Sequence, residues 1–142
     1  MLVLELLGTL SLRSETDPVP VSAQQKRPLG LLAILALGGS QGLARNRIEA
    51  FLWPDSSDAA ASHALDQTVY AIRHSLGTDF ILATGRDLRL NPELVRIDVW
   101  EFDDAIRAKD WSAAAGIYKG PLLEGFHFGD SNDLESWIDS RR

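Results

Sequence analysis

The segment PLGLLAILAL, residues 28–37, restricts the fold more than any other, because apolar side chains cover nearly every side of it. A helix that is apolar all round is enclosed by other elements or lies in a membrane. The whole apolar stretch, residues 28–39, is shorter than the roughly 18 residues of a membrane span. We therefore expect a central, buried helix over about residues 24–37, ended by Gly38 and Gly39.

The composition indicates a globular protein. The chain has 142 residues, of which 45% are hydrophobic and 24% charged, and it contains no cysteine. Disulfides and thiolate metal sites are therefore excluded. The start, MLVLELLGTLSLR, has no basic region before its apolar residues and alternates like a strand, unlike a signal peptide. We expect a cytoplasmic protein with no membrane span.

The net charge of −6 is unevenly distributed. Residues 1–90 hold 8 Lys and Arg against 9 Asp and Glu, a net charge of −1. Residues 91–142 hold 6 against 11, a net charge of −5. The first part is nearly neutral, so basic residues clustered on one of its faces could still contact nucleic acid.

The expected order of elements is a sheet, three helices and a hairpin. Residues 2–12 read as a strand, and residues 14–22 as a turn followed by an edge strand, which gives an N-terminal antiparallel sheet. Helices follow over about residues 24–37, 45–52 and 59–76. Residues 80–93 then form a hairpin around a glycine. This α+β order describes a winged helix-turn-helix, with the last two helices as the turn unit and the hairpin as the wing.

The third helix has two distinct sides. Leucine, valine and isoleucine recur at helical spacing and form a narrow apolar stripe: Leu65, Val69, Ile72 and Leu76. Polar and aromatic residues fall on the opposite side: His63, Gln67, Tyr70 and His74. Asp66 and Arg73 lie on one flank. Such a helix could lie in a DNA groove, although an aspartate beside phosphates is unfavourable.

After residue 97 the pattern becomes helical. Residues 99–120 read as two short helices broken near Lys109 and Asp110, which together resemble one unit of a helical repeat, such as a tetratricopeptide-like α-hairpin. A further helix begins near Asn132. One helical pair and a fragment cannot bury a repeat core alone. Two alternatives follow: the chain is the front piece of a longer protein, or the helices pack on the winged domain. The four tryptophans are expected in packing: Trp53, Trp100, Trp111 and Trp137.

Several stretches in this order resemble one family. They are LELLGTLSL, QKRPLGLLAILAL, LARNRIEAFLWPD, IRHSLG, LRLNPELVRIDVWEFDDAI, IYKGPLLEGF and LESWIDSRR. Together they are similar to the front of the Streptomyces antibiotic regulatory protein type of transcription factor. That family pairs an OmpR/PhoB-like winged helix with a bacterial transcriptional activator domain of tetratricopeptide-like helices. The resemblance implies a DNA-binding domain over residues 1–96 and the start of the activator domain over residues 97–142.

The resemblance also implies roles. Residues 59–76 would be the recognition helix in the major groove and residues 80–90 the wing. Basic groups would contact phosphate: Lys26, Arg27, Arg45, Arg47 and Arg86. Side chains of the third helix would read bases: Gln67, Tyr70, Arg73 and His74. His63, also a candidate DNA contact, would face phosphate, as His74 could too. Arg89, in the hairpin, completes the candidate set, with a solvent-exposed role as the alternative for each residue. Arg73 could instead form a surface ion pair with Asp66 or Asp79.

Two functions stay open at this point. The first is a sequence-specific DNA-binding regulator, whose partners would be double-stranded DNA, RNA polymerase or other domains of a longer chain, and a second copy on repeated sites. The second is a protein-interaction module that kept the winged fold and lost DNA binding. Asp66, the small number of basic residues and the acidic C-terminal third favour the second function. The wing also ends Asp87-Leu88-Arg89-Leu90, without the family's Gly-Tyr.

Nothing in the sequence indicates an enzyme or a cofactor. Neither a GK[ST] phosphate loop nor a GxSxG nucleophile motif occurs. The adjacent pair Asp103 and Asp104 reads as a helix surface. His63 and His74 are about three helical turns apart, too far to share one ion, and His127 lies in another segment. We therefore expect no metal site.

Overall fold

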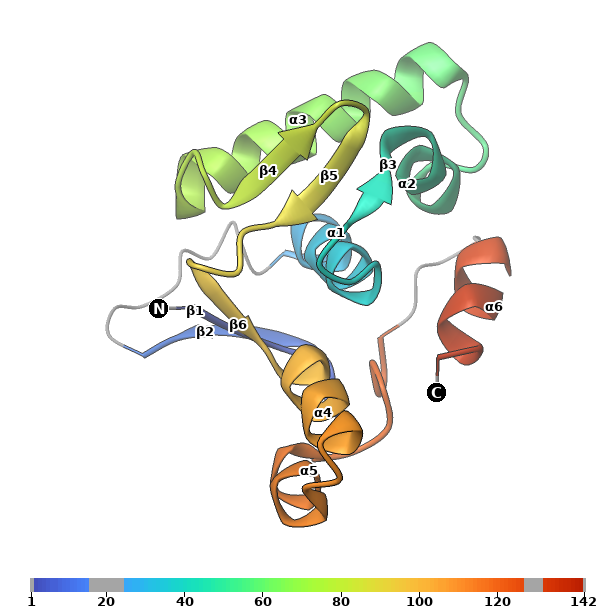
Figure 1. The fold of residues 1–142 in the computed structure, drawn as a ribbon. Coiled ribbons are helices and arrows are strands. Elements are labelled where there is room, and N and C mark those ends of the chain that lie inside the picture. Colours follow the sequence, from blue (N-terminus) through green and yellow to red (C-terminus); the bar gives the residue numbers. More distant parts are fainter. Residues whose placement is uncertain (1, 16–24, 127–131, 142) are drawn as a thin grey trace.

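The computed structural model describes residues 2–15, 25–126 and 132–141 and has an α+β fold (Figure 1). Its elements are β1 (Leu2–Glu5), β2 (Ser11–Ser14), α1 (Lys26–Leu37), β3 (Leu43–Ala44), α2 (Arg45–Leu52), α3 (Asp58–Leu76), β4 (Ile81–Thr84), β5 (Asp87–Leu90), β6 (Val95–Ile97), α4 (Asp98–Arg107), α5 (Trp111–Ile117) and α6 (Asn132–Asp139). The predicted α+β class is confirmed. We call α1–α3 with β3, β4 and β5 the three-helix unit, and α4–α6 the helical segment.

The N-terminal sheet differs from the prediction in two ways. The single strand expected over residues 2–12 is two antiparallel strands, β1 and β2, with Leu2 opposite Ser14. The chain reverses at Gly8, whose φ is +94°. The sheet is also mixed, because β6 pairs with β1 in parallel and gives the order β2-β1-β6. The edge strand expected within residues 14–22 lies almost entirely outside the described residues.

Helix α1 is the centre of the core, as predicted. Every residue from Leu29 to Leu37 is buried. The helix ends at Gly38, and Gly39 follows with a φ of +78°. Elements of both the three-helix unit and the helical segment pack around α1, so one hydrophobic cluster extends through the molecule.

Helices α2 and α3 begin and end close to the predicted residues. The side chain of Ser57 caps α3 by accepting a hydrogen bond from the Ala60 amide at 3.2 Å. This contact satisfies one of the amide groups left unpaired at a helix start. Leu65, Val69 and Ile72 are buried, which confirms the predicted apolar stripe.

The predicted hairpin is β4 and β5, which pair from Ile81 opposite Leu90 to Thr84 opposite Asp87. Strand β3, which the sequence did not predict, pairs with β5 on the other side. Gly42 makes this third strand possible. Its φ is +78°, and a Cβ atom there would lie 2.0 Å from the Leu88 carbonyl oxygen, so only glycine fits.

The helical segment packs on the rest of the molecule, as the second of the two alternatives above expects. Helices α4 and α5 form the predicted α-hairpin, with the break at Lys109, whose φ is +58°. Trp100 donates a hydrogen bond from Nε1 to the Ala36 carbonyl at 2.7 Å. Arg141 donates from Nη1 to the Leu37 carbonyl at 2.9 Å. Both contacts tie the segment to the last turn of α1.

Asp98 makes a third, buried link. Its side chain is 7% exposed, and its two carboxylate oxygens accept hydrogen bonds from the amides of Leu6 and Leu7, each at 2.9 Å. Burial raises the pKa of the Asp98 carboxyl, while the hydrogen bonds from backbone amides oppose that rise. The first residue of α4 thus fixes the end of β1.

The expectation that all four tryptophans serve packing is wrong for one of them. Trp53, Trp100 and Trp137 lie partly buried against the core. Trp111 is 60% exposed at the start of α5.

No helix in the described part of the chain is long and apolar enough to cross a membrane.

Candidate nucleic-acid interface

The outer side of α3 is the principal candidate surface. His63, Gln67, Tyr70 and His74 are all exposed there, as the helical spacing predicted. Tyr70 is 71% exposed, and its ring stacks on that of His74 with centroids 6.0 Å apart. This side of the helix therefore presents an amide, a phenol and two imidazoles to the solvent. All of these groups can form hydrogen bonds to nucleic acid.

Asp66, the unexpected acid of this helix, is engaged within the chain. One of its carboxylate oxygens lies 2.5 Å from Nη2 of Arg45 at the start of α2. The Arg45 backbone amide in turn donates to the Arg86 carbonyl at 2.8 Å. Arg45 therefore connects α2, α3 and the β4–β5 turn. The pair fastens α3 to α2 and offsets the charge of Asp66 near the candidate surface.

Arg73 has a similar internal role. Its guanidinium donates two hydrogen bonds to the Ile81 carbonyl, from Nη2 at 2.8 Å and from Nε at 3.2 Å. The partner considered from the sequence, Asp66 or Asp79, is not the one observed. The arginine expected to be the foremost base-contacting residue thus holds the end of α3 to β4 and is only partly exposed.

Two other candidate arginines lie in packing contacts. Arg27 donates to the Leu52 carbonyl at 2.8 Å, and its guanidinium lies over the ring of Trp53. Arg47 lies over the rings of Phe51 and Trp137, at 5.4 and 5.3 Å from their centroids. Arg47 thus faces α6, whereas Arg45, two residues earlier, faces α3.

Three candidate cations keep their charged groups available. Among the described residues, the side chains of Lys26, Arg86 and Arg89 have no hydrogen-bond or ion-pair partner. Arg86 stands at the tip of the β4–β5 hairpin. It borders a cavity of about 540 Å³ together with Asn46 of α2 and Asp58 of α3. The hairpin tip therefore lies next to the start of α3.

The contacts of Arg45 and Arg73 could not be found in the sequence. Arg45 and Asp66 are 21 residues apart, and nothing in their local pattern pairs them. A backbone carbonyl, the acceptor of Arg73, is present at every residue and leaves no sequence signal.

The described residues contain no group of three or more acidic, histidine or cysteine side chains that could hold a metal ion. His127, considered with His63 and His74 above, lies outside the described residues. Asp104 pairs with Arg107 at 3.2 Å on the surface of α4.

Comparisons with known proteins show the fold. No protein-family model matches the chain, and no curated protein matches it in sequence. A solved structure, Mycobacterium tuberculosis EmbR in complex with a low-affinity phosphopeptide, matches over 99% of the chain with a TM-score of 0.70 and 20% identity. The chain spans 41% of the length of that EmbR chain. At this identity, the likeness shows that the two share a fold over nearly all of the present chain.

Proposed function

We propose that the chain is a DNA-binding transcription regulator in which α2, α3 and the β4–β5 hairpin act as a winged helix-turn-helix. The observation that carries the proposal is the two-sided helix α3. Its apolar stripe is buried and its outer side exposes Gln67 and Tyr70, while the hairpin tip with Arg86 lies next to the start of the same helix. EmbR, whose fold it shares, is a regulator of the family that the sequence resembles.

In this proposal α3 enters the major groove. Gln67 can pair with both edge groups of an adenine, and Tyr70 and the two histidines can reach bases or sugar. Arg86 at the hairpin tip enters the neighbouring minor groove or contacts phosphate. Lys26 and Arg89 add phosphate contacts. The pairs Arg45–Asp66 and Arg73–Ile81 contact no DNA and hold α3 in place.

The helical segment supplies a protein-contacting surface. It is acidic and firmly joined to the three-helix unit, and its Trp111 is exposed. We propose that it contacts RNA polymerase or further domains of a longer chain in the cytoplasm.

Selection of bound duplexes from a random DNA library, at low and at physiological salt, tests the proposal. We expect enrichment of a motif by the wild-type chain and its loss in the Gln67→Ala/Tyr70→Ala variant. Arg86→Ala should weaken binding to all sequences, and Lys109→Ala, which removes a cation from the turn between α4 and α5, serves as the matched control. No binding by the wild type even at low salt would reject the proposal.

The second candidate is a winged fold that binds protein instead of DNA. Internal contacts of Arg27, Arg45, Arg47 and Arg73 favour it, because they leave few cations available near α3. It predicts that Arg86→Ala and Lys109→Ala behave alike toward DNA. It also predicts that a partner protein protects Tyr70 from solvent.

A further inference from the structure

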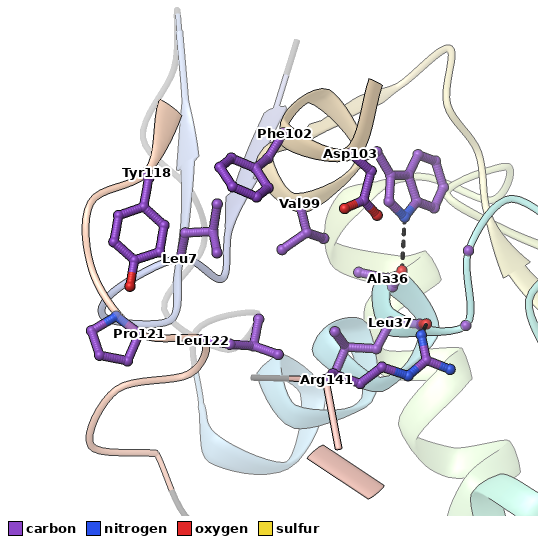
Figure 2. A pocket seen from close by; sticks show the side chains of 13 residues that line it. Leu7, Ala36, Leu37, Val99, Phe102, Asp103, Tyr118, Pro121, Leu122 and Arg141 are labelled. Atoms are coloured by element: carbon purple, nitrogen blue, oxygen red, sulfur yellow. Dashed lines mark hydrogen bonds between the residues drawn. The ribbon is translucent and has the colours of Figure 1, made fainter. Parts of the chain in front are cut away.

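A second cavity lies where the helical segment meets the three-helix unit, away from the outer side of α3 (Figure 2). Its volume is about 510 Å³, within the range of small-molecule sites in proteins. The walls come from the end of α1, one side of α4, the residues Tyr118, Pro121 and Leu122 after α5, and Arg141. Leu7 at the turn after β1 closes it from another side.

Apolar side chains form about half of the wall of this cavity, beside polar groups. Leu7, Leu37, Val99, Phe102 and Leu122 line it, and Phe102 and Tyr118 lie with ring centroids 6.0 Å apart. The polar groups of the wall beneath are already used, because the Ala36 carbonyl accepts from Trp100 and the Leu37 carbonyl accepts from Arg141. These two carbonyls are therefore already paired within the chain, and a ligand would meet apolar side chains beside them.

Two groups of opposite charge border the same cavity without pairing with each other. The carboxylate of Asp103 has no hydrogen-bond or ion-pair partner among the described residues. Arg141 uses Nη1 for the Leu37 carbonyl and stacks over Trp137, which leaves other guanidinium N–H groups available. In Figure 2, Asp103 comes from the α4 side and Arg141 from the opposite side, past Leu37.

We propose that this cavity binds a small zwitterion with an apolar body, of the size of a dipeptide. The ligand's ammonium group pairs with Asp103 and its carboxylate accepts hydrogen bonds from Arg141. Its side chains pack against Phe102 and Leu122. A dipeptide carries an ammonium group at one end and a carboxylate at the other, which matches the two groups of opposite charge that border this cavity.

The position of the cavity gives the ligand a structural consequence. Asp103 belongs to α4, whereas Arg141 follows α6 and is fixed to the end of α1. A ligand that bridges the two side chains adds a link between α4 and α1. Bound ligand should therefore raise the midpoint of thermal unfolding, as any ligand of the folded state does.

Isothermal titration calorimetry of the 142-residue chain with leucyl-phenylalanine tests the proposal. We expect saturable binding of the free dipeptide. N-acetylation removes the ammonium charge and C-terminal amidation removes the carboxylate, and each should weaken binding roughly tenfold or more, because each removes a charged hydrogen bond. These capped ligands need no change in the protein. No binding of the free dipeptide, or equal binding of the capped forms, would overturn the proposal.

Protein variants locate the site. Asp103→Asn should weaken the binding of the free dipeptide but leave the binding of its N-acetyl form unchanged, because that form has no ammonium group. Arg141→Gln should weaken the binding of the free dipeptide but leave the binding of its amidated form unchanged, because that form has no carboxylate. Asp104→Asn is the matched control, since Asp104 is the neighbouring acid on α4 and does not line the cavity. Equal effects of Asp103→Asn and Asp104→Asn would also overturn the proposal.

Discussion

The three-helix unit and the helical segment are held in different ways. Within the three-helix unit, α1 and the inner side of α3 meet through apolar side chains that are almost completely buried, such as Ile34 and Leu65. The helical segment adds apolar contacts, but hydrogen bonds that Asp98 accepts and that Trp100 and Arg141 donate fix where it lies. Apolar contacts supply most of the stability, whereas these hydrogen bonds define how the segment is oriented.

The largest expected effect is in the core of the three-helix unit. Ile34→Ala should lower the free energy of unfolding by about 2–5 kcal/mol, because Ile34 is fully buried and its removal leaves a cavity. Urea denaturation measures the change. A loss of less than about 1 kcal/mol would mean that the core rearranges to fill the space.

Asp98→Ala tests the buried link between β1 and α4. The amides of Leu6 and Leu7 would lose their acceptors, and each buried amide left without one costs about 1–3 kcal/mol. Hydrogen exchange of these two amides should increase together with the loss of stability. Asp98→Asn keeps one acceptor oxygen, so its stability should lie between those of wild type and Asp98→Ala. Unchanged exchange in both variants would contradict the assigned link.

Trp100→Phe should have a smaller effect. The ring is largely kept, while the hydrogen bond from Nε1 to the Ala36 carbonyl is lost. We expect a loss of about 0.5–1.5 kcal/mol in urea denaturation. Trp111→Phe, at the exposed tryptophan of α5, is the control and should change stability little. Equal losses of stability in the two variants would contradict the role given to the Trp100 hydrogen bond.

The smallest effect is expected at Glu5, which lies on the surface of the N-terminal sheet. A hydrogen bond from Lys119, and another from Arg13, lower the pKa of the Glu5 carboxyl despite its partial burial. Its stabilising contribution is therefore present above the usual pKa of 4.5 and is lost as the pH falls through the lowered value. Glu5→Gln should cost no more than about 1 kcal/mol at pH 7 and nothing at strongly acid pH. If the difference in free energy of unfolding between wild type and Glu5→Gln grew as the pH falls, the prediction would be contradicted.

Sequence periodicity predicted the elements well where one period dominates. The all-apolar segment of α1 and the stripe through Leu65, Val69 and Ile72 required only local spacing. The parallel pairing of β1 with β6 and the short strand β3 were missed, because both depend on partners far along the chain. The outer side of α3 was predicted correctly as exposed. The internal contacts of Arg73, Arg45 and Arg47 were not, because they depend on how α3 lies relative to α2, β4 and α6.

This difference changes the expected DNA chemistry. From sequence alone, five cations were assigned to phosphate. In the structure, three of them contact other groups of the same chain: Arg27, Arg45 and Arg47. Lys26, Arg86 and Arg89 remain as the available phosphate contacts, so the salt dependence of binding should be shallow.

The salt dependence of duplex binding tests the central claim most directly, because it counts phosphate contacts without knowledge of the operator. With about three phosphates neutralised, log affinity should fall against log salt with a slope of roughly −2 to −3. Arg86→Ala should reduce the magnitude of that slope by about 1, and Lys109→Ala should leave it unchanged. A wild-type slope near zero, or equal slopes for the two variants, would contradict the assignment of α3 and the hairpin as a DNA-binding surface.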